Sequence, residues 1–179
     1  VGLDIGSSAV KAIELKKSGR GFKVTAIGVE PVPPDSIVDG AIMDAGAVTD
    51  AVRRVLQSPR FKAKDVVASL SGSSVIVKKI SLPVMSEADL ADSIQWEAEQ
   101  YIPFDIQDVN LDYQILTPVA ERQGTMEVLL VAAKKDKIAD YTGVVSAVGR
   151  KTVVVDVDAF ALQNAFETNY TDDAGKVVA

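Results

Sequence analysis

The stretch Val1-Gly-Leu-Asp-Ile-Gly-Ser-Ser-Ala-Val-Lys11 is the most informative part of this sequence. An apolar strand carries Asp4, turns through Gly6-Ser7-Ser8, and returns as a second strand that carries Lys11. Glycine adopts backbone angles that other residues avoid, and successive amides at such a turn form a concave anion nest. The serine hydroxyls add donors, Lys11 adds positive charge, and Asp4 is suited to holding magnesium through its waters. The pattern therefore predicts a hairpin tip that binds a phosphate.

Taken alone, this short pattern fits an ordinary hairpin with a Gly-Ser turn equally well. Its spacing also differs from the P-loop and dinucleotide-binding fingerprints. The choice between a phosphate site and a plain turn therefore depends on the rest of the chain.

Composition narrows the chemistry that is available to this chain. Its 179 residues suffice for one large or two small domains, and the net charge of −6 with no basic patch argues against nonspecific nucleic-acid binding. The absence of cysteine and histidine excludes disulfides, thiolate zinc sites and the Ser-His-Asp and Cys-His nucleophile systems. Carboxylates, lysines, hydroxyls and amides remain, and these groups are best suited to phosphate handling with magnesium.

Hydrophobicity points to a soluble, cytosolic protein. No apolar run approaches the ~20 residues that span a bilayer, and no signal peptide is visible.

The predicted elements form an outer part with an insertion. The outer part has strands at Val1–Ile5, Ala9–Lys16, Lys23–Val29, Asp65–Ser71 and Thr152–Val157, a helix capped by Thr49, and a helix at Asp158–Glu167. The insertion has strands at Ser74–Leu82, Val109–Leu116 and Met126–Ala133, with helices capped by Ser86 and Asp136. Ala174–Ala179 reads as the start of a further strand, so we expect the chain to be a piece of a longer polypeptide.

Three stretches carry a resemblance to the PilM family, the cytoplasmic actin-like proteins of type IV pilus assembly. Val1–Lys11 matches the first phosphate motif of the actin-like superfamily. Ser81–Phe104, with its E-A-E-Q-Y-I-P-F run, is the most specific stretch, and Val154–Glu167 matches the family's return strand and connecting helix. The chain is similar, more distantly, to the cell-division protein FtsA and to the cytoplasmic part of GspL.

The resemblance implies an α/β fold. An actin-like (ribonuclease H-like) subdomain 1A, residues 1–73 and 152–179, would hold an inserted α+β subdomain 1C of the SHS2 type, residues 74–151. Relatives bind ATP and Mg²⁺ between 1A and a second half, whose motifs are absent from this sequence. We therefore expect no meaningful ATPase activity from these residues alone.

The resemblance also assigns ligand-binding residues. ATP would contact Asp4, Gly6, Ser7, Ser8 and Lys11, with Asp4 holding Mg²⁺ through water. Asp156 is a further candidate near the metal, and Asp158 is a candidate near the terminal phosphate. A strand-end aspartate and a helix N-cap explain these last two residues at least as well.

The densest aromatic cluster, Trp96, Tyr101, Ile102 and Phe104, has two readings. It packs the core of the insertion, or part of it lines a groove for a partner peptide. Relatives bind the N-terminal cytoplasmic peptide of the membrane protein PilN in a channel between 1A and 1C. The resemblance further implies contacts with other pilus-assembly proteins, including assembly ATPases, and self-association.

The sequence thus predicts a cytoplasmic nucleotide-binding scaffold, peripheral to the inner membrane and reaching it only through partners. An FtsA-like division protein is one alternative. A sugar-kinase-type phosphotransferase is another, although the substrate aspartate and sugar-binding loop that it needs are not evident.

Overall fold

The computed structural model describes residues 1–19, 21–70, 72, 75–117 and 124–170. The chain divides into two units: the first holds Val1–Ser71 and Tyr141–Ala179, and the second holds Gly72–Asp140. The insertion is expected to end at residue 151, whereas the division between the units lies within helix α3 (Lys135–Ala147). The strand expected at Ala174–Ala179 lies outside the described residues.

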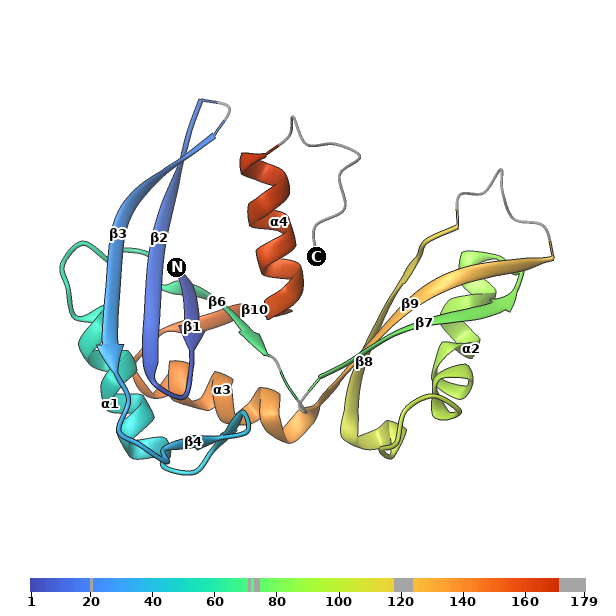
Figure 1. Ribbon diagram of the computed structural model, residues 1–179, viewed down its shortest axis with the longest axis horizontal. Helices are drawn as coiled ribbons and strands as arrows, with labels where there is room; N and C mark the ends of the chain where they lie inside the picture. Colours follow the sequence, from blue (N-terminus) through green and yellow to red (C-terminus); the bar gives the residue numbers. More distant parts are fainter. Residues whose placement is uncertain (20, 71, 73–74, 118–123, 171–179) are drawn as a thin grey trace. The chain divides into compact units, whose positions relative to one another are not determined.

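The first unit is built on a five-stranded sheet with the order β10-β6-β1-β2-β3 (Figure 1). Its strands are β1 (Gly2–Ile5), β2 (Ala9–Ser18), β3 (Gly21–Pro31), β6 (Asp65–Leu70) and β10 (Lys151–Val157). β1 pairs in parallel with β6 and antiparallel with β2, and β6 pairs in parallel with β10. The short strands β4 (Ile37–Val38) and β5 (Ala41–Ile42) form a separate ribbon.

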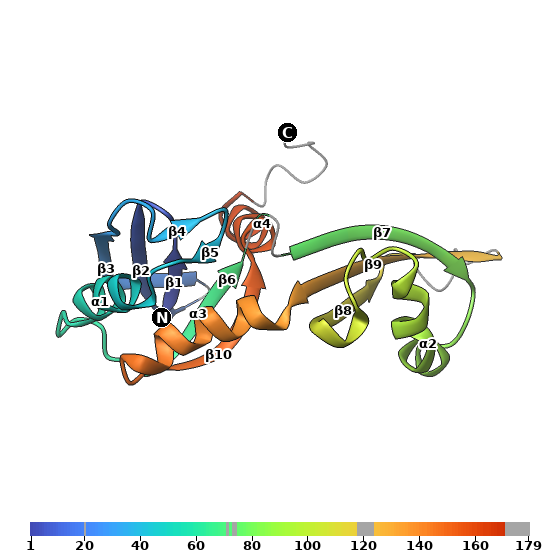
Figure 2. The ribbon, with the colours of Figure 1, turned by 90° about the horizontal axis from the view of Figure 1, so that it is seen from below.

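Helices lie on both faces of this sheet. Figure 2 shows α1 (Ala45–Leu56) and the later part of α3 on one face, and α4 (Asp158–Asn169) on the other. The α1 face forms the core, because the apolar side of α1 buries Val48, Ala51, Val52, Val55 and Leu56. α4 buries none of its residues, so it covers its face of the sheet only in part.

Gly28 shows how closely α1 packs on the sheet. A Cβ at this position of β3 would lie 2.7 Å from Cγ2 of Val55 and 3.3 Å from Cε2 of Phe61. Real Cβ contacts are not that short, so glycine lets the α1 core sit directly on the strand.

Two charged side chains hold the connection between α1 and β6 by hydrogen bonds to its backbone. The Glu14 carboxylate on β2 accepts hydrogen bonds from the backbone N–H groups of Lys62 (2.8 Å) and Ala63 (3.0 Å). The Arg150 guanidinium donates to the carbonyl of Ala63 and to that of Phe61 at 3.4 Å. These backbone donors, that of Ala63 foremost, hold the pKa of the Glu14 carboxyl below its usual range.

The second unit is a three-stranded antiparallel sheet of order β7-β9-β8, comprising β7 (Val75–Pro83), β9 (Thr125–Lys134) and β8 (Val109–Ile115). Helix α2 (Glu87–Glu99) packs on one face, and a 3₁₀ turn, η2 (Ile106–Asp108), leads into β8. The core between helix and sheet consists of Ile80, Leu82, Leu90, Ile94, Ala98, Ile102, Val109, Met126, Val128, Leu130 and Ala132.

Two of the three predicted helix caps are wrong. α1 begins four residues before Thr49, because the Asp44 carboxylate accepts the Ala47 N–H at 2.9 Å and takes the N-cap position. α3 begins at Lys135, so Asp136 lies in its first turn. There its negative charge interacts favourably with the positive end of the helix dipole. Ser86 does cap α2, accepting the Asp89 N–H at 3.1 Å as predicted.

Every helix in the described part of the chain is too short or too polar to span a lipid bilayer.

Glu14→Gln tests the connection between α1 and β6. The folded chain holds this pKa below the unfolded value of about 4.3. The stabilisation that the charge provides is therefore complete above about pH 4.3, and it is lost as the pH falls through the folded pKa. We expect the variant to have a lower free energy of unfolding than the parent at pH 7, with the difference shrinking in acid. Denaturant unfolding at a series of pH values checks this, and an equal difference at every pH contradicts it.

Candidate functional site

The turn between β1 and β2 is the first part of the candidate site. The register pairs Ile5 with Val10 and Asp4 with Lys11, which leaves Gly6, Ser7 and Ser8 at the tip. Ser7 and Ser8 are exposed, so their hydroxyls are accessible to a ligand. The predicted hairpin tip is therefore present, with two exposed serines.

Gly6 plays a different part from the one expected. Its N–H donates to the Ala9 carbonyl at 3.1 Å, so this amide closes the turn. The φ angle of Gly6 is not positive, so the backbone conformation does not require glycine at this position. Glycine is required because a side chain would lack space. A Cβ there would lie 3.2 Å from the Ala9 carbonyl oxygen, a contact tighter than side chains normally make.

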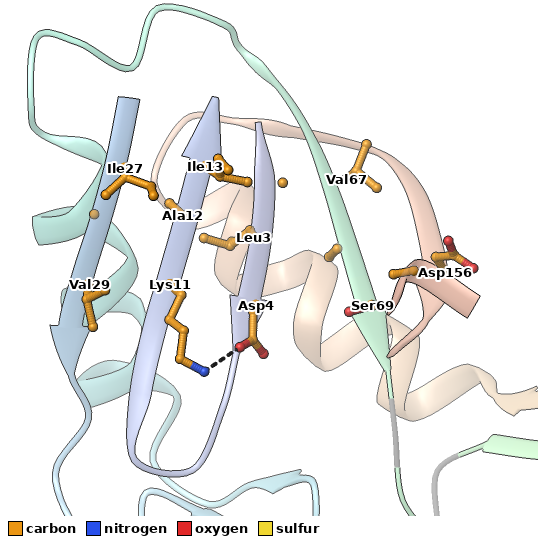
Figure 3. A pocket seen from close by; sticks show the side chains of 14 residues that line it. Leu3, Asp4, Lys11, Ala12, Ile13, Ile27, Val29, Val67, Ser69 and Asp156 are labelled. Carbon is orange, nitrogen blue, oxygen red and sulfur yellow. Dashed lines mark hydrogen bonds and ion pairs between the residues drawn. The ribbon is translucent and has the colours of Figure 1, made fainter. Parts of the chain in front are cut away.

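Asp4 and Lys11 form an ion pair across the two strands. Lys11 Nζ donates to Asp4 Oδ2 at 2.8 Å, and both side chains are about half exposed (59% and 49%) (Figure 3). The hydrogen bond to Asp4 is the main cause that raises the pKa of the Lys11 ammonium above its ordinary value. The charge of Asp4 and, less, that of Asp158 also raise the pKa. A phosphate that recruits Lys11 must therefore compete with Asp4.

A hollow of about 390 Å³ lies on the sheet face beside this pair. Its polar rim holds Asp4 and Lys11, together with Ser69 on β6 and Asp156 on β10. In Figure 3, β6 separates Asp156 from Asp4, so the two carboxylates flank the hollow and do not meet. The structure thus brings Asp4, Lys11 and Asp156 to one hollow, whose lining does not include Gly6, Ser7 or Ser8.

The rest of the hollow is apolar. Ile13, Ile27, Val29 and Val67 line it from the sheet, and Ala161 contributes from α4. Ile27 is 69% exposed and Val29 62% exposed, so this wall faces solvent. Neither this wall nor Ser69 was predicted from the sequence. Alternating apolar residues such as Ile13, Ile27 and Val29 do indicate a second apolar face on these strands. Periodicity alone does not tell which face of the sheet another element covers.

The two later aspartates differ in their surroundings. Asp156 Oδ1 accepts the Val157 N–H at 2.7 Å, while Asp158 is the first residue of α4. The N-cap of α4 is Val157, with no side-chain hydrogen bond, so reading Asp158 as the cap is wrong. Its contribution to the Lys11 pKa places its charge within electrostatic reach of the site.

The donor set fits a hydrated magnesium–phosphate better than a bare cation. Among the described residues, no three carboxylates gather as a metal cage. Magnesium keeps several of its waters and needs only one or two carboxylates when phosphate oxygens complete its shell. Asp4 would hold such an ion through its waters, and Ser7, Ser8 and Lys11 would contact the phosphate.

The aromatic cluster divides between core and surface. Ile102 is buried, and Tyr101 and Phe104 pack against the core, as the core reading predicted. Trp96 is 66% exposed, so for this residue the core reading is wrong. The tryptophan lies outside the buried spacing of Leu90, Ile94 and Ala98, a signal that the sequence already contained.

Comparison with known proteins identifies related chains. The family model described as "Type IV pilus assembly protein PilM" matches residues 2–176. A chain solved in the "PilM-PilN type IV pilus biogenesis complex" is 31% identical and has a TM-score of 0.86, covering 98% of this chain and 52% of that one.

A second solved structure shares the fold at lower identity. It is the cytoplasmic domain of EpsL, an inner membrane component of the type II secretion system of Vibrio cholerae. It is 17% identical with a TM-score of 0.56, and the match covers 89% of this chain and 57% of that one. The predicted α/β class is confirmed, and the chain spans little more than half the length of these solved relatives.

The Asp4–Lys11 pair makes a testable electrostatic prediction. We expect Asp4→Asn to lower the pKa of Lys11 most, because it removes both the hydrogen bond and the facing charge. Asp158→Asn should lower the pKa of Lys11 less. The control is Asp156→Asn, because Asp156 lines the same hollow. NMR titration of the lysine Cε signals in alkaline solution gives the order of the three variants. An equal effect from all of them would contradict the assignment.

Proposed function

The chain belongs to the family of type IV pilus assembly protein PilM, and from this premise we propose that it is a nucleotide-regulated docking scaffold. In this role it binds the N-terminal cytoplasmic peptide of PilN, and in the intact protein it holds Mg²⁺-ATP at the turn between β1 and β2. It acts on the cytoplasmic side of the inner membrane, which it reaches through its partners.

The PilN contact is carried by one observation. The relative with a TM-score of 0.86 over 98% of this chain was solved as a PilM-PilN complex. A match of that extent covers both units, so the surfaces available to a peptide are expected to be shared. An extended peptide loses conformational freedom when it binds, and a preformed docking surface reduces that cost.

The nucleotide proposal is supported by the site. Bound Mg²⁺-ATP would place a concentrated negative charge and a divalent cation at this turn. This difference in charge would distinguish the bound state of the chain from the unbound state. The Ser7 and Ser8 hydroxyls would donate to phosphate oxygens, Lys11 would neutralise charge, and Asp4 would orient the waters of the ion. When a phosphate engages Lys11, the lysine leaves Asp4, and the carboxylate becomes free for the metal.

In this proposal Asp4, Ser7, Ser8 and Lys11 bind and position the ligand. We therefore place the function in ligand-dependent assembly rather than in turnover. Neither the FtsA-like role nor the sugar-kinase role is favoured by a contact or side chain in the described residues.

PilN docking is tested with the isotopically labelled chain and a synthetic peptide of the N-terminal cytoplasmic residues of PilN from the same organism. We expect saturable amide shifts that cluster on one surface, and no such shifts with a scrambled peptide of the same composition. If both peptides behave alike, the chain does not recognise PilN.

Nucleotide binding is tested in the full-length protein, with Lys11→Met compared against Lys17→Met on the same strand. We expect the first variant to weaken ATP binding roughly tenfold, as for the loss of a charge-assisted hydrogen bond, and the second to leave it unchanged. Asp4→Asn should weaken binding only when Mg²⁺ is present. Fluorescent-nucleotide titrations with and without EDTA give these affinities. Equal losses of ATP affinity in both lysine variants would contradict the proposed nucleotide site. They would not contradict the proposal that the chain docks PilN.

A further inference from the structure

Trp96 is the only tryptophan of the chain, and it is 66% exposed on α2. The opposite side of the helix buries Leu90, Ile94 and Ala98 against the sheet of the second unit. A large aromatic side chain on the outer side contributes nothing to that core. Tryptophan is among the residues most often found at the centre of protein interfaces, so its exposure needs a reason.

All of the charged side chains of α2 are acidic. Glu87, Asp89, Asp92, Glu97 and Glu99 give it five carboxylates, and it has no lysine or arginine. No salt bridge joins any of these carboxylates to a cation among the described residues. Acidic residues in the last turn, with no basic residue there, oppose the helix dipole and destabilise the isolated helix.

Trp96 stands between two of these carboxylates. Asp92 lies one turn before it and Glu99 one turn after it, and both are exposed. Gln95 is also exposed and lies one turn from both Asp92 and Glu99. We call Asp92, Gln95, Trp96 and Glu99 the Trp96 surface.

The other aromatic rings of this cluster already have cations of their own. Lys78 Nζ lies 5.2 Å from the ring centre of Tyr101, and Lys134 Nζ lies 4.0 Å from that of Phe104. Within the described residues no such cation lies over Trp96, although indole is the ring that attracts cations best. An exposed indole flanked by carboxylates and lacking an internal cation is complementary to a cation from outside.

We propose that the Trp96 surface docks a cationic segment of a partner protein, with an arginine or lysine over the indole and further basic side chains beside Asp92 and Glu99. The proposal concerns α2 alone and does not rest on PilN docking or on nucleotide binding. The sign of the charge decides against a membrane as the occupant, because anionic headgroups would be repelled by the same carboxylates.

The lone tryptophan makes the test direct, because all of the tryptophan fluorescence comes from Trp96. The probe is tetra-arginine amide, with tetra-glycine amide and tetra-glutamate as controls. We expect a saturable change of Trp96 emission with the arginine peptide only, weakening as salt is raised because the contacts lie at the surface.

Variants separate a cation–indole contact from general acidity, with binding followed by NMR amide shifts and folding checked by circular dichroism. Trp96→Leu should weaken tetra-arginine binding roughly two- to fivefold, whereas Trp96→Phe should keep part of the affinity. Asp92→Asn with Glu99→Gln should weaken it further. The charge-matched control, Asp108→Asn with Asp112→Asn, removes two exposed carboxylates of the same unit and should have no effect.

Four outcomes overturn the proposal. Unchanged affinity in Trp96→Leu, or equal losses in both carboxylate pairs, would mean that the peptide binds by net charge alone. A blue shift of Trp96 emission with phosphatidylglycerol vesicles would make the surface a membrane contact. A concentration-dependent sedimentation coefficient that Trp96→Leu abolishes would make a second copy of the chain the occupant.

Discussion

The pairing of β1 is the constraint on which the first unit depends. This four-residue strand lies at the centre of the sheet, with a parallel partner on one side and an antiparallel partner on the other. Leu3 and Ile5 are buried, so the strand cannot shift by one residue without exposing them. That register sets Asp4 opposite Lys11 and leaves Gly6, Ser7 and Ser8 in the turn where β1 ends and β2 begins.

The two faces of this sheet are used differently. One face is filled by α1, close enough that Gly28 has no room for a Cβ. The other face carries α4 over β10 and β6 and leaves Ile27 and Val29 exposed beside the polar rim of the hollow. A polar rim next to an open apolar wall suits a ligand or another protein surface. The second unit repeats this division, with a packed side and a charged outer side on α2.

Much of the fold follows from local sequence, and the errors have physical causes. The strands of the two larger sheets agree with prediction to within about two residues, because alternation and turn residues are local signals, whereas the short strands β4 and β5 were not predicted. The start of α1 was misplaced because Asp44 and Thr49 are both good caps, and only the final packing selects one. In the candidate site, Asp4 and Lys11 were expected at the phosphate. Their pairing with each other depends on strand register, as does the use of the Gly6 amide to close the turn.

The sequence by itself determined the α/β class, the family, the Gly-Ser-Ser turn between β1 and β2, and the exclusion of histidine and cysteine chemistry. These follow from residue identity and from spacing along the chain. Only the tertiary structure decided that Asp156 and Ser69 share a hollow with Asp4, and that Trp96 faces away from its core. Both depend on which segments pack together and which face of an element is covered. Packing joins residues far apart in the sequence, and so local patterns do not encode it.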